Sequence, residues 1–312
     1  MLHLINDSVY ASESDRIGPF AGCDGIELLT GYETVDPRIY GEAVSAHLPY
    51  CTDWYSVWTG RIDVPEDISD IDARYIFYGR NREDIIDSVR RFIEAASPLE
   101  PAYGVIHAGS AKFDELISNS YSESDSIVLS AFAEMMNSAV SVFPNGEPPF
   151  RILFENQWWP GLRMLDGSGH RMLVNSLEFE NWGLCLDTGH ILVATHRSEN
   201  EIQAAELLLD VFDGYPEDMI DDIVTVHLHV NTSAEYIRSH KGDPMFGERP
   251  FMERLRMGYK HVCSMDTHRP FSVAEARDLA DRLSPDFVTH EMGAVNADDR
   301  VKDYLIQRSL FP

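Results

Sequence analysis

The stretch Leu-Cys-Leu-Asp-Thr-Gly-His at residues 184–190 joins an apolar run to two side chains that can bind a metal ion. A short, continuously apolar run is typical of a parallel strand that is buried on both faces. Asp187 would end this strand, and His190 would follow after a tight turn that contains Gly189. Because this spacing lets both side chains face one centre, the stretch predicts a pair of metal ligands at the C-terminal end of a buried strand.

The same pattern recurs along the chain, with helical patterns between the strand-like runs. The runs cover residues 2–5, 25–29, 44–47, 103–107, 151–155, 183–187, 224–229 and 286–291. Amphipathic helical patterns cover residues 81–96, 124–142, 199–212 and 272–283. In the last of these, Ser272 and Glu275 have the spacing of a capping box. This alternation predicts an α/β fold, a closed (β/α)8 barrel that forms one domain over residues 1–312.

An open, doubly wound sheet is the rival architecture. It would favour a glycine-rich phosphate turn after the first strand, and the sequence has none there. The stretch 232–265, between the seventh strand and the last, is long enough to be an insertion and is locally basic. We interpret it either as a helix-bearing surface insertion or as a lid over an anionic substrate, with Arg254 and Arg256 among its cations.

Potential metal ligands lie at or just after the ends of these runs. A barrel gathers the C-terminal ends of its strands into one ring, so distant residues can meet around a metal. The candidates are His47, His107, Glu155, Asp187, His190, His227, Asp266, His268 and Glu291. Imidazole and carboxylate ligands without sulfur suit Zn²⁺, Mn²⁺ or Mg²⁺, and the histidines favour zinc or manganese.

Several of these assignments leave alternatives open. His47 and His107 are either ligands or groups that hydrogen-bond a substrate. His227 and His229 project on the same face of a strand, and we favour His227 as the ligand. His229 would then bond a carboxylate or the substrate. His290, beside Glu291, should face away into the layer between barrel and helices.

Aromatic and basic residues near the same strand ends are candidates for substrate binding. Trp158 and Trp159 follow the strand that ends at Glu155, and they could form a wall for the face of a sugar or simply pack in the loop. Arg269 comes directly after the pair formed by Asp266 and His268. With the two insertion arginines, these residues complete the set of expected substrate contacts.

Composition limits the classes of partner. The formal net charge of −27 argues against nucleic acid, because proteins bind its phosphates through lysine and arginine. No apolar run has the roughly 18 residues that a membrane span requires, and the N-terminus lacks the layout of a secretory signal. The four cysteines form no Cys-x-x-Cys pair. We therefore expect a cytoplasmic protein that acts on a small molecule.

The order of these motifs resembles a known superfamily. His-Leu-Pro-Tyr, Ile-His-Ala-Gly-Ser, Phe-Glu-Asn, Leu-Asp-Thr-Gly-His, Val-His-Leu, Asp-Thr-His and a glutamate at the end of the last strand occur in that order. The chain resembles the xylose isomerase-like TIM barrels, which include sugar phosphate isomerases and epimerases and endonuclease IV (AP endonuclease family 2). The resemblance covers nearly the whole chain, and each motif is weak alone while their order is specific.

The resemblance implies two kinds of activity. In the isomerase and epimerase branch, Glu155, Asp187, His227 and Glu291 would hold one metal, the two glutamates would move a proton between neighbouring carbons, and His190 would steady a substrate oxygen. In the endonuclease IV branch, all nine candidates would bind three zinc ions that hydrolyse a phosphodiester. Ala108 and Val230 depart from that branch, which usually has a proline and an acidic residue there.

These implications give an ordered set of expectations. A metal-dependent isomerase or epimerase of a sugar or sugar phosphate comes first. A multinuclear zinc phosphodiester hydrolase is the alternative, and a non-catalytic barrel that retains metal is the second alternative. The sequence does not indicate the oligomeric state.

Overall fold

Eight parallel strands form a closed barrel in which each strand pairs with its neighbours in sequence. The computed structural model describes residues 1–18, 20–62, 64–66, 68–240 and 242–311. The strands are β1 (Leu2–Ser8), β2 (Gly25–Leu29), β3 (Ala43–His47), β4 (Tyr103–His107), β5 (Arg151–Glu155), β6 (Trp182–Asp187), β7 (Ile223–Leu228) and β8 (Phe287–His290). The pairing of Leu2 with Phe287 closes the ring, so strands from both ends of the chain share one sheet. The predicted (β/α)8 barrel is confirmed.

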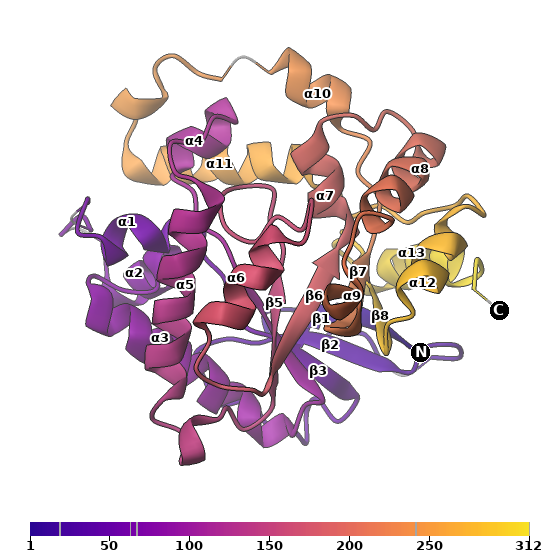
Figure 1. Ribbon diagram of the computed structural model, residues 1–312, viewed down its shortest axis with the longest axis horizontal. Coiled ribbons are helices and arrows are strands. Elements are labelled where there is room, and N and C mark those ends of the chain that lie inside the picture. The colour runs from indigo at the N-terminus through magenta and orange to yellow at the C-terminus, as the bar shows by residue number, and fades with distance from the viewer. Residues whose placement is uncertain (19, 63, 67, 241, 312) are drawn as a thin grey trace.

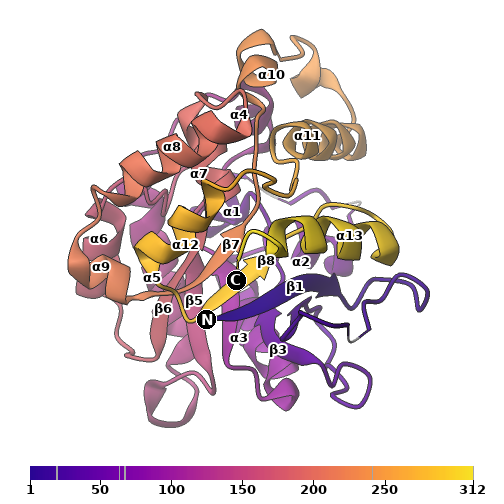
Figure 2. The same cartoon turned by 90° about the vertical axis from the view of Figure 1, so that its right-hand side faces the viewer.

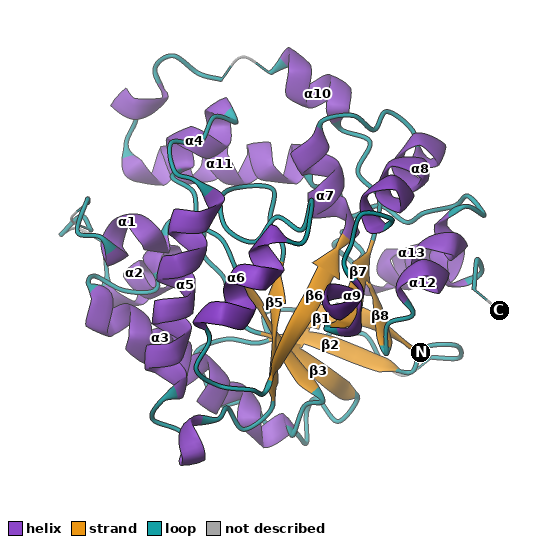
Figure 3. Ribbon diagram, viewed as in Figure 1, coloured by secondary structure: helices purple, strands orange, loops and turns teal. Residues whose placement is uncertain are grey.

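Helices surround the barrel, as Figure 3 shows. They are α1 (Trp54–Trp58), α2 (Asp70–Phe77), α3 (Arg82–Ala96), α4 (Phe113–Ser118), α5 (Asp125–Val140), α6 (Ser168–Ser176), α7 (Thr188–Thr195), α8 (Glu201–Phe212), α9 (Glu217–Asp221), α10 (Ala234–Ser239), α11 (Phe251–Met265), α12 (Ala276–Leu283) and α13 (Ala297–Arg308). Short 3₁₀ turns occur at Ser97–Leu99, Pro144–Gly146 and Phe246–Glu248. The largest apolar core lies between the strands and these helices, where Phe92, Phe132, Phe154 and Phe212 are fully buried.

Side-chain caps fix where several helices begin. The Asn81 side chain accepts a hydrogen bond from the Asp84 amide at the start of α3, and Asn200 accepts one from Gln203 at the start of α8. Ser124 caps α5 in the same way, by accepting a hydrogen bond from the Ile127 amide. These caps satisfy amides that have no partner inside the helix.

The predicted capping box at Ser272 is wrong. Helix α12 begins at Ala276, and its N-cap residue Glu275 makes no side-chain cap bond. Glu201, at the start of α8, instead accepts hydrogen bonds from the amide and the hydroxyl of Ser272, at 2.6 and 3.0 Å. A carboxylate from a neighbouring helix therefore takes both donors of the expected cap.

The predicted insertion at 232–265 carries α10, a 3₁₀ turn and α11. In Figures 1 and 2 it lies at the top of the molecule, with α11 near α4. An apolar cluster that includes Leu116, Trp158, Val193, Ile237 and Met265 holds the insertion against α4, α7 and the loop that follows β5. The insertion thus packs over the C-terminal ends of the strands.

Over the described parts of the chain, no helix combines the length and the apolar character that are needed to cross a membrane.

Candidate metal centre

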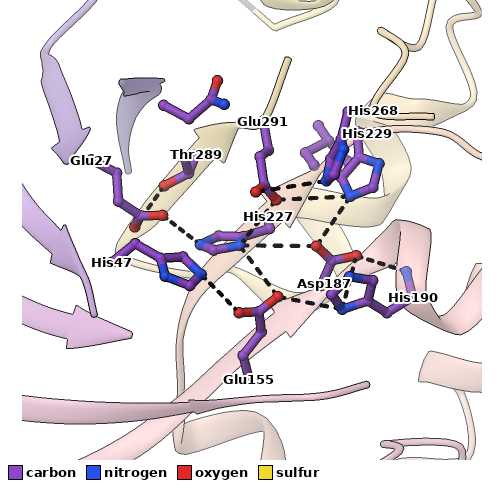
Figure 4. Close-up of polar contacts among 12 residues, drawn as sticks. Glu27, His47, Glu155, Asp187, His190, His227, His229, His268, Thr289 and Glu291 are labelled. Atoms are coloured by element: carbon purple, nitrogen blue, oxygen red, sulfur yellow. Dashed lines mark hydrogen bonds and ion pairs between the residues drawn. The ribbon is translucent and has the colours of Figure 1, made fainter. Parts of the chain in front are cut away.

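Four of the predicted ligands meet around one ring nitrogen. Nδ1 of His227, at the end of β7, lies 3.3 Å from Glu291 Oε2, 3.8 Å from Glu155 Oε1 and 3.9 Å from Asp187 Oδ2. Ligand atoms that share one zinc or manganese ion lie roughly 3 to 3.5 Å apart, given bond lengths of about 2.0–2.2 Å. Glu155, Asp187 and His227, from the ends of β5, β6 and β7, each offer a ligand atom within 4.8 Å of those of the other two, and Glu291 after β8 adjoins this group at His227 (Figure 4).

A second group forms on the other side of Glu155. The other oxygen of this carboxylate, Oε2, lies 3.2 Å from His47 Nε2 and 3.1 Å from His107 Nε2. Each of the three residues offers a ligand atom within 4.8 Å of those of the other two. Glu155 thus belongs to two groups of donors, one through each oxygen.

A third group forms around Asp266, in the loop after α11. Asp266 Oδ2 lies 3.4 Å from His190 Nε2 and 3.4 Å from His268 Nε2. His268 also approaches Glu291 and His229, and these three form a further set that could hold an ion. All nine predicted ligands consequently lie in one connected cluster.

Backbone carbonyls orient two of the imidazoles. The Nδ1 atom of His47 is 2.9 Å from the Leu48 carbonyl, and Nδ1 of His190 is 2.7 Å from the Asn156 carbonyl. A carbonyl accepts but does not donate, so Nδ1 carries the proton in each ring. With a metal ion between the rings and the carboxylates, the lone pair on Nε2 would face that ion, as a metal ligand requires.

Local structure near Asp187 differs from the predicted tight turn. Thr188 begins α7, and Asp187 is its N-cap, whose side chain accepts a hydrogen bond from the His190 amide at 2.7 Å. His190 therefore lies in the first turn of a helix. Gly189 allows this helix to pass close to β7, because a Cβ on Gly189 would lie 1.9 Å from His229 Cε1.

Burial and the neighbouring charges shift the pKa values of the clustered side chains in opposite directions. Burial alone would raise the pKa of Glu155, but His107 and His47 outweigh it and hold this pKa well below its usual range. Burial likewise opposes protonation of His190, yet Asp187 and Asp266 raise its pKa well above the ordinary value. Burial lowers the pKa of His107. The buried carboxylates thus require positive charge close by, which divalent cations would provide.

The donor set fits such cations. Several buried atoms of the described cluster have no hydrogen-bond partner, namely His107 Nδ1, His227 Nδ1 and Nε2, His229 Nδ1 and Glu291 Oε2. Buried polar atoms are normally satisfied, so these atoms require another partner. For His227 Nδ1 and Glu291 Oε2, which face one another, a shared metal ion is the partner that the surrounding oxygens suit.

His229 and His290 take different roles. His229 Nε2 lies 3.0 Å from Asp187 Oδ2, so His229 can either hold this carboxylate or bind an ion with His268 and Glu291. His290 faces away from the cluster, as predicted. Its ring lies against Tyr304 and makes a 3.0 Å contact with His3 Nδ1, in the layer outside the barrel.

A cavity of about 750 Å³ opens beside the cluster. His47, His107, Glu155 and Glu291 are among its lining residues, with Tyr50 stacked on the His107 ring at 4.5 Å between centroids. The insertion contributes Arg256, Tyr259 and Cys263 to the outer wall. A site of this size suits a small molecule.

The predicted substrate residues divide between the cavity and the surface. Trp158 and Trp159 line the cavity and are almost fully buried, with 2% and 3% exposure. Arg256 also lines it. Arg254 lies over the Phe251 ring, 5.7 Å from its centroid, and Arg269 is exposed; neither is among the lining residues. Substrate contact by Arg254 and Arg269 stays a prediction.

Sequence reasoning missed Glu27, on β2. Its side chain is buried, and Oε1 lies 2.7 Å from His227 Nε2. The residue interrupts the otherwise apolar run Gly-Ile-Glu-Leu-Leu at 25–29. A lone carboxylate in a strand that is buried on both faces requires a polar partner, and this signal could have identified it.

No protein-family model matches the sequence, and no curated protein matches it. Among solved structures, the chain is similar to a D-tagatose 3-epimerase-like protein, with 16% identity, a TM-score of 0.52 and coverage of 99% of this chain and 97% of that one. It is also similar to endonuclease IV from Thermus thermophilus, with 14% identity, a TM-score of 0.51 and coverage of 99% and 98%. In its closed barrel and in these likenesses, the chain has the fold of the xylose isomerase-like TIM barrel proteins, as its motifs predicted.

Proposed function

We propose that the chain is a metal-dependent hydrolase of phosphoester bonds in small molecules, with a centre that holds more than one divalent ion. The observation that carries the proposal is the sharing of Glu155 between two groups of donors, one for each carboxylate oxygen. Adjacent metal sites joined in this way are typical of phosphatases and nucleases. This grouping moves our preference from the isomerase that the sequence placed first to its hydrolase alternative.

Three sets of side chains would hold the ions. The first is His47, His107 and Glu155. The second is Glu155, Asp187 and His227, to which we add Glu291 because it lies 3.3 Å from His227. The third is His190 and His268, which both lie near Asp266, together with Asp266 itself. Zinc suits the many imidazoles, and manganese is the next choice. When bound, such ions lower the pKa of a water ligand and stabilise negative charge on a phosphoryl oxygen.

The rest of the cavity would position the substrate. Tyr50, Trp158 and Trp159 provide apolar surface that excludes water and packs against the organic part of the ester. Arg256 lines the same cavity and can pair with a phosphate oxygen. The carbonyl-bound rings of His47 and His190 keep the donor geometry fixed before substrate arrives.

The surface favours a small substrate over DNA. The chain has a formal net charge of −27, and a nucleic acid backbone would be repelled by it. A compact phosphoester needs to approach only the cavity mouth, where bound cations offset the local carboxylates. We therefore restrict the proposal to metabolite-sized esters.

Isomerisation is the second candidate, and the placement of two carboxylates favours it. Glu155 and Glu291 come from different strands and both approach His227 Nδ1, at 3.8 and 3.3 Å. Two carboxylates that flank a bound sugar can remove a proton from one carbon and return one to its neighbour. His190 would then steady a substrate oxygen, and one ion held by Glu155, Asp187, His227 and Glu291 would suffice.

Counting metals and testing both reactions on one preparation distinguishes the candidates. Elemental analysis of the purified chain should find two or three zinc or manganese ions per chain, and the same sample should hydrolyse para-nitrophenyl phosphate esters. Isomerase activity would instead appear as deuterium incorporation into sugars or sugar phosphates in heavy water. One ion per chain together with such exchange would overturn the hydrolase proposal. Bound metal with neither reaction would favour a non-catalytic barrel.

A further inference from the structure

We infer that Glu27 is a positioning residue that orients His227 so that Nδ1, and not Nε2, binds the metal. This inference rests on the proposed metal centre. It assigns a role to a carboxylate that is itself outside the three ligand sets. The role follows from where Glu27 lies, what else it contacts and how the neighbouring imidazoles are held.

Glu27 lies inside the barrel, beneath the ligand ring. It is 2% exposed, and its Oε1 is 2.7 Å from His227 Nε2 (Figure 4). The two atoms lie within ion-pair distance, although their arrangement falls short of an in-line hydrogen bond. Across the described ranges, His227 is the one ion-pair partner of this carboxylate.

Hydroxyl groups from three strands lie close to the second oxygen of Glu27. A hydroxyl from a fourth strand lies close to one of these three groups. Oε2 lies 3.0 Å from the Tyr103 hydroxyl, 3.2 Å from Ser45 Oγ and 3.2 Å from Thr289 Oγ1. The Tyr103 hydroxyl also lies 3.2 Å from Thr225 Oγ1. These groups can donate to Oε2, so they hold the carboxylate in place and leave Oε1 for the histidine.

His227 is held through its Nε2 atom, whereas His47 and His190 are held through Nδ1. His47 and His190 each face a backbone carbonyl through Nδ1, and their Nε2 atoms face the carboxylates of the centre. In His227 the order is reversed, because Nε2 faces Glu27 while Nδ1 faces Glu155, Asp187 and Glu291. An acceptor at Nε2 retains the proton there and presents the Nδ1 lone pair to the ion.

A carboxylate does more than a carbonyl in this position. Its charge makes the imidazole a stronger donor to the metal, and the loss of such partners typically weakens metal binding tenfold to a hundredfold. Glu27 should therefore affect the metal affinity of the set that contains His227, and leave the set of His47 and His107 largely unchanged.

Metal affinity of Glu27→Gln tests the inference, because glutamine keeps the shape and removes the charge. We expect one class of zinc sites to bind at least about tenfold more weakly, measured by competition with a chromophoric chelator. Glu115→Gln is the matched control. Glu115 is also a buried glutamate, but its partners are Lys112 and Ser122, away from the ligand sets. Circular dichroism and thermal unfolding verify that both variants fold.

Proton NMR of the zinc-loaded chain supplies a readout that a merely structural role would not change. The wild type should show an exchange-protected proton on the buried His227 Nε2, assigned by its absence in His227→Asn. In Glu27→Gln this resonance should shift or vanish, while those of His47 and His190 remain. A His227 ring with its proton on Nδ1 would overturn the inference.

The outcomes separate this inference from the proposed function. A wild-type chain that binds no metal would remove the metal centre, and the inference with it. A wild type that binds several ions, with equal zinc affinity in Glu27→Gln, would leave the centre in place and overturn only the role of Glu27. Selective weakening in Glu27→Gln, with Glu115→Gln unchanged, would support it.

Discussion

Gly189 and His229 approach so closely that a Cβ added to the glycine would lie 1.9 Å from His229 Cε1. The same Cβ would lie 2.6 Å from Asn231 Nδ2, which donates a hydrogen bond to Asp266. The start of α7 and the end of β7 thus fit together only when residue 189 has no side chain. Any larger residue must displace groups that touch the third set of ligands.

Gly189→Ala should therefore disturb the metal centre as well as the fold. We expect a loss of roughly 1–3 kcal/mol in the free energy of unfolding, as is usual for overpacked sites, together with a lower zinc content. Urea unfolding and elemental analysis measure the two effects. Gly18→Ala is the control, because nothing lies within 4 Å of the added Cβ there. If both variants had the same free energy of unfolding and the same zinc content, the close fit between Gly189 and His229 would be contradicted.

Glu155→Gln should abolish turnover while the chain stays folded. The carboxylate contacts His47, His107, His190 and His227, so its loss removes the shared ligand of two sets. We expect kcat to fall at least about a hundredfold and the metal count to drop. Glu134→Gln, which alters an exposed glutamate paired with Arg82, should behave as the wild type. Retained activity in Glu155→Gln would remove the central role of this residue.

Removal of metal should destabilise the chain. Buried carboxylates would lose the cations that offset them, and a ligand that binds only the folded state at a thousand times its Kd contributes about 4 kcal/mol. We expect Tm to fall after treatment with a chelator and to recover when zinc is added. Magnesium should restore less, because imidazole ligands suit it poorly. A Tm that is independent of metal would count against a bound ion in the native state.

Arg256 should discriminate between anionic and neutral ligands. Its side chain lines the cavity, whereas Arg254 lies over Phe251 and outside the lining. Arg256→Glu should weaken the binding of a phosphorylated ligand by about tenfold or more, and change the binding of its neutral counterpart much less. Lys260→Glu, at an exposed position on the same helix and outside the cavity lining, is the control within α11. Equal changes for both ligands in Arg256→Glu would defeat the lid interpretation.

Asp53 should make stability depend on pH. Burial raises the pKa of this carboxyl to about 7. Between its unfolded value near 4 and this folded value, the folded state binds more protons. Its contribution to stability is therefore present at low pH and is lost as pH rises through that window. Asp53→Asn should abolish this part of the pH dependence.

Urea unfolding at about pH 5 and about pH 8 measures the effect of Asp53, which should not exceed about 4 kcal/mol. Asp210→Asn, at an exposed position on α8, provides the control. If wild type and Asp53→Asn lost stability equally between the two pH values, the effect would have another source.

The strand ends were predictable because they combine two physical demands. Each strand is covered on both faces and is therefore continuously apolar, and a polar residue at its end marks the rim. For this reason β4 and β5 match the predicted 103–107 and 151–155, and Glu155 falls where expected. The order of these ends also indicated the ring, since a closed barrel leaves only one arrangement for them.

Other features depend on contacts between segments that are distant in sequence. Ser272 has the local signature of a cap, but its donors are taken by Glu201 from another helix. Glu27 gained its partner only when β2 and β7 closed around the same interior. The grouping of donors into overlapping sets likewise follows from strand stagger, which residue spacing does not reveal.

The barrel supplies most of the proposed metal ligands and the insertion supplies part of the cavity wall, and this separation has an evolutionary consequence. Most of the proposed ligands belong to rigid strand ends, whereas Arg256, Tyr259 and Cys263 reach the cavity from one separate segment. Changes to these cavity-facing side chains can alter which compounds enter while the strand-end ligands, and Asp266 directly after α11, keep their places. Relatives that vary only such side chains would be free to adopt new substrates while they inherit the same reaction chemistry.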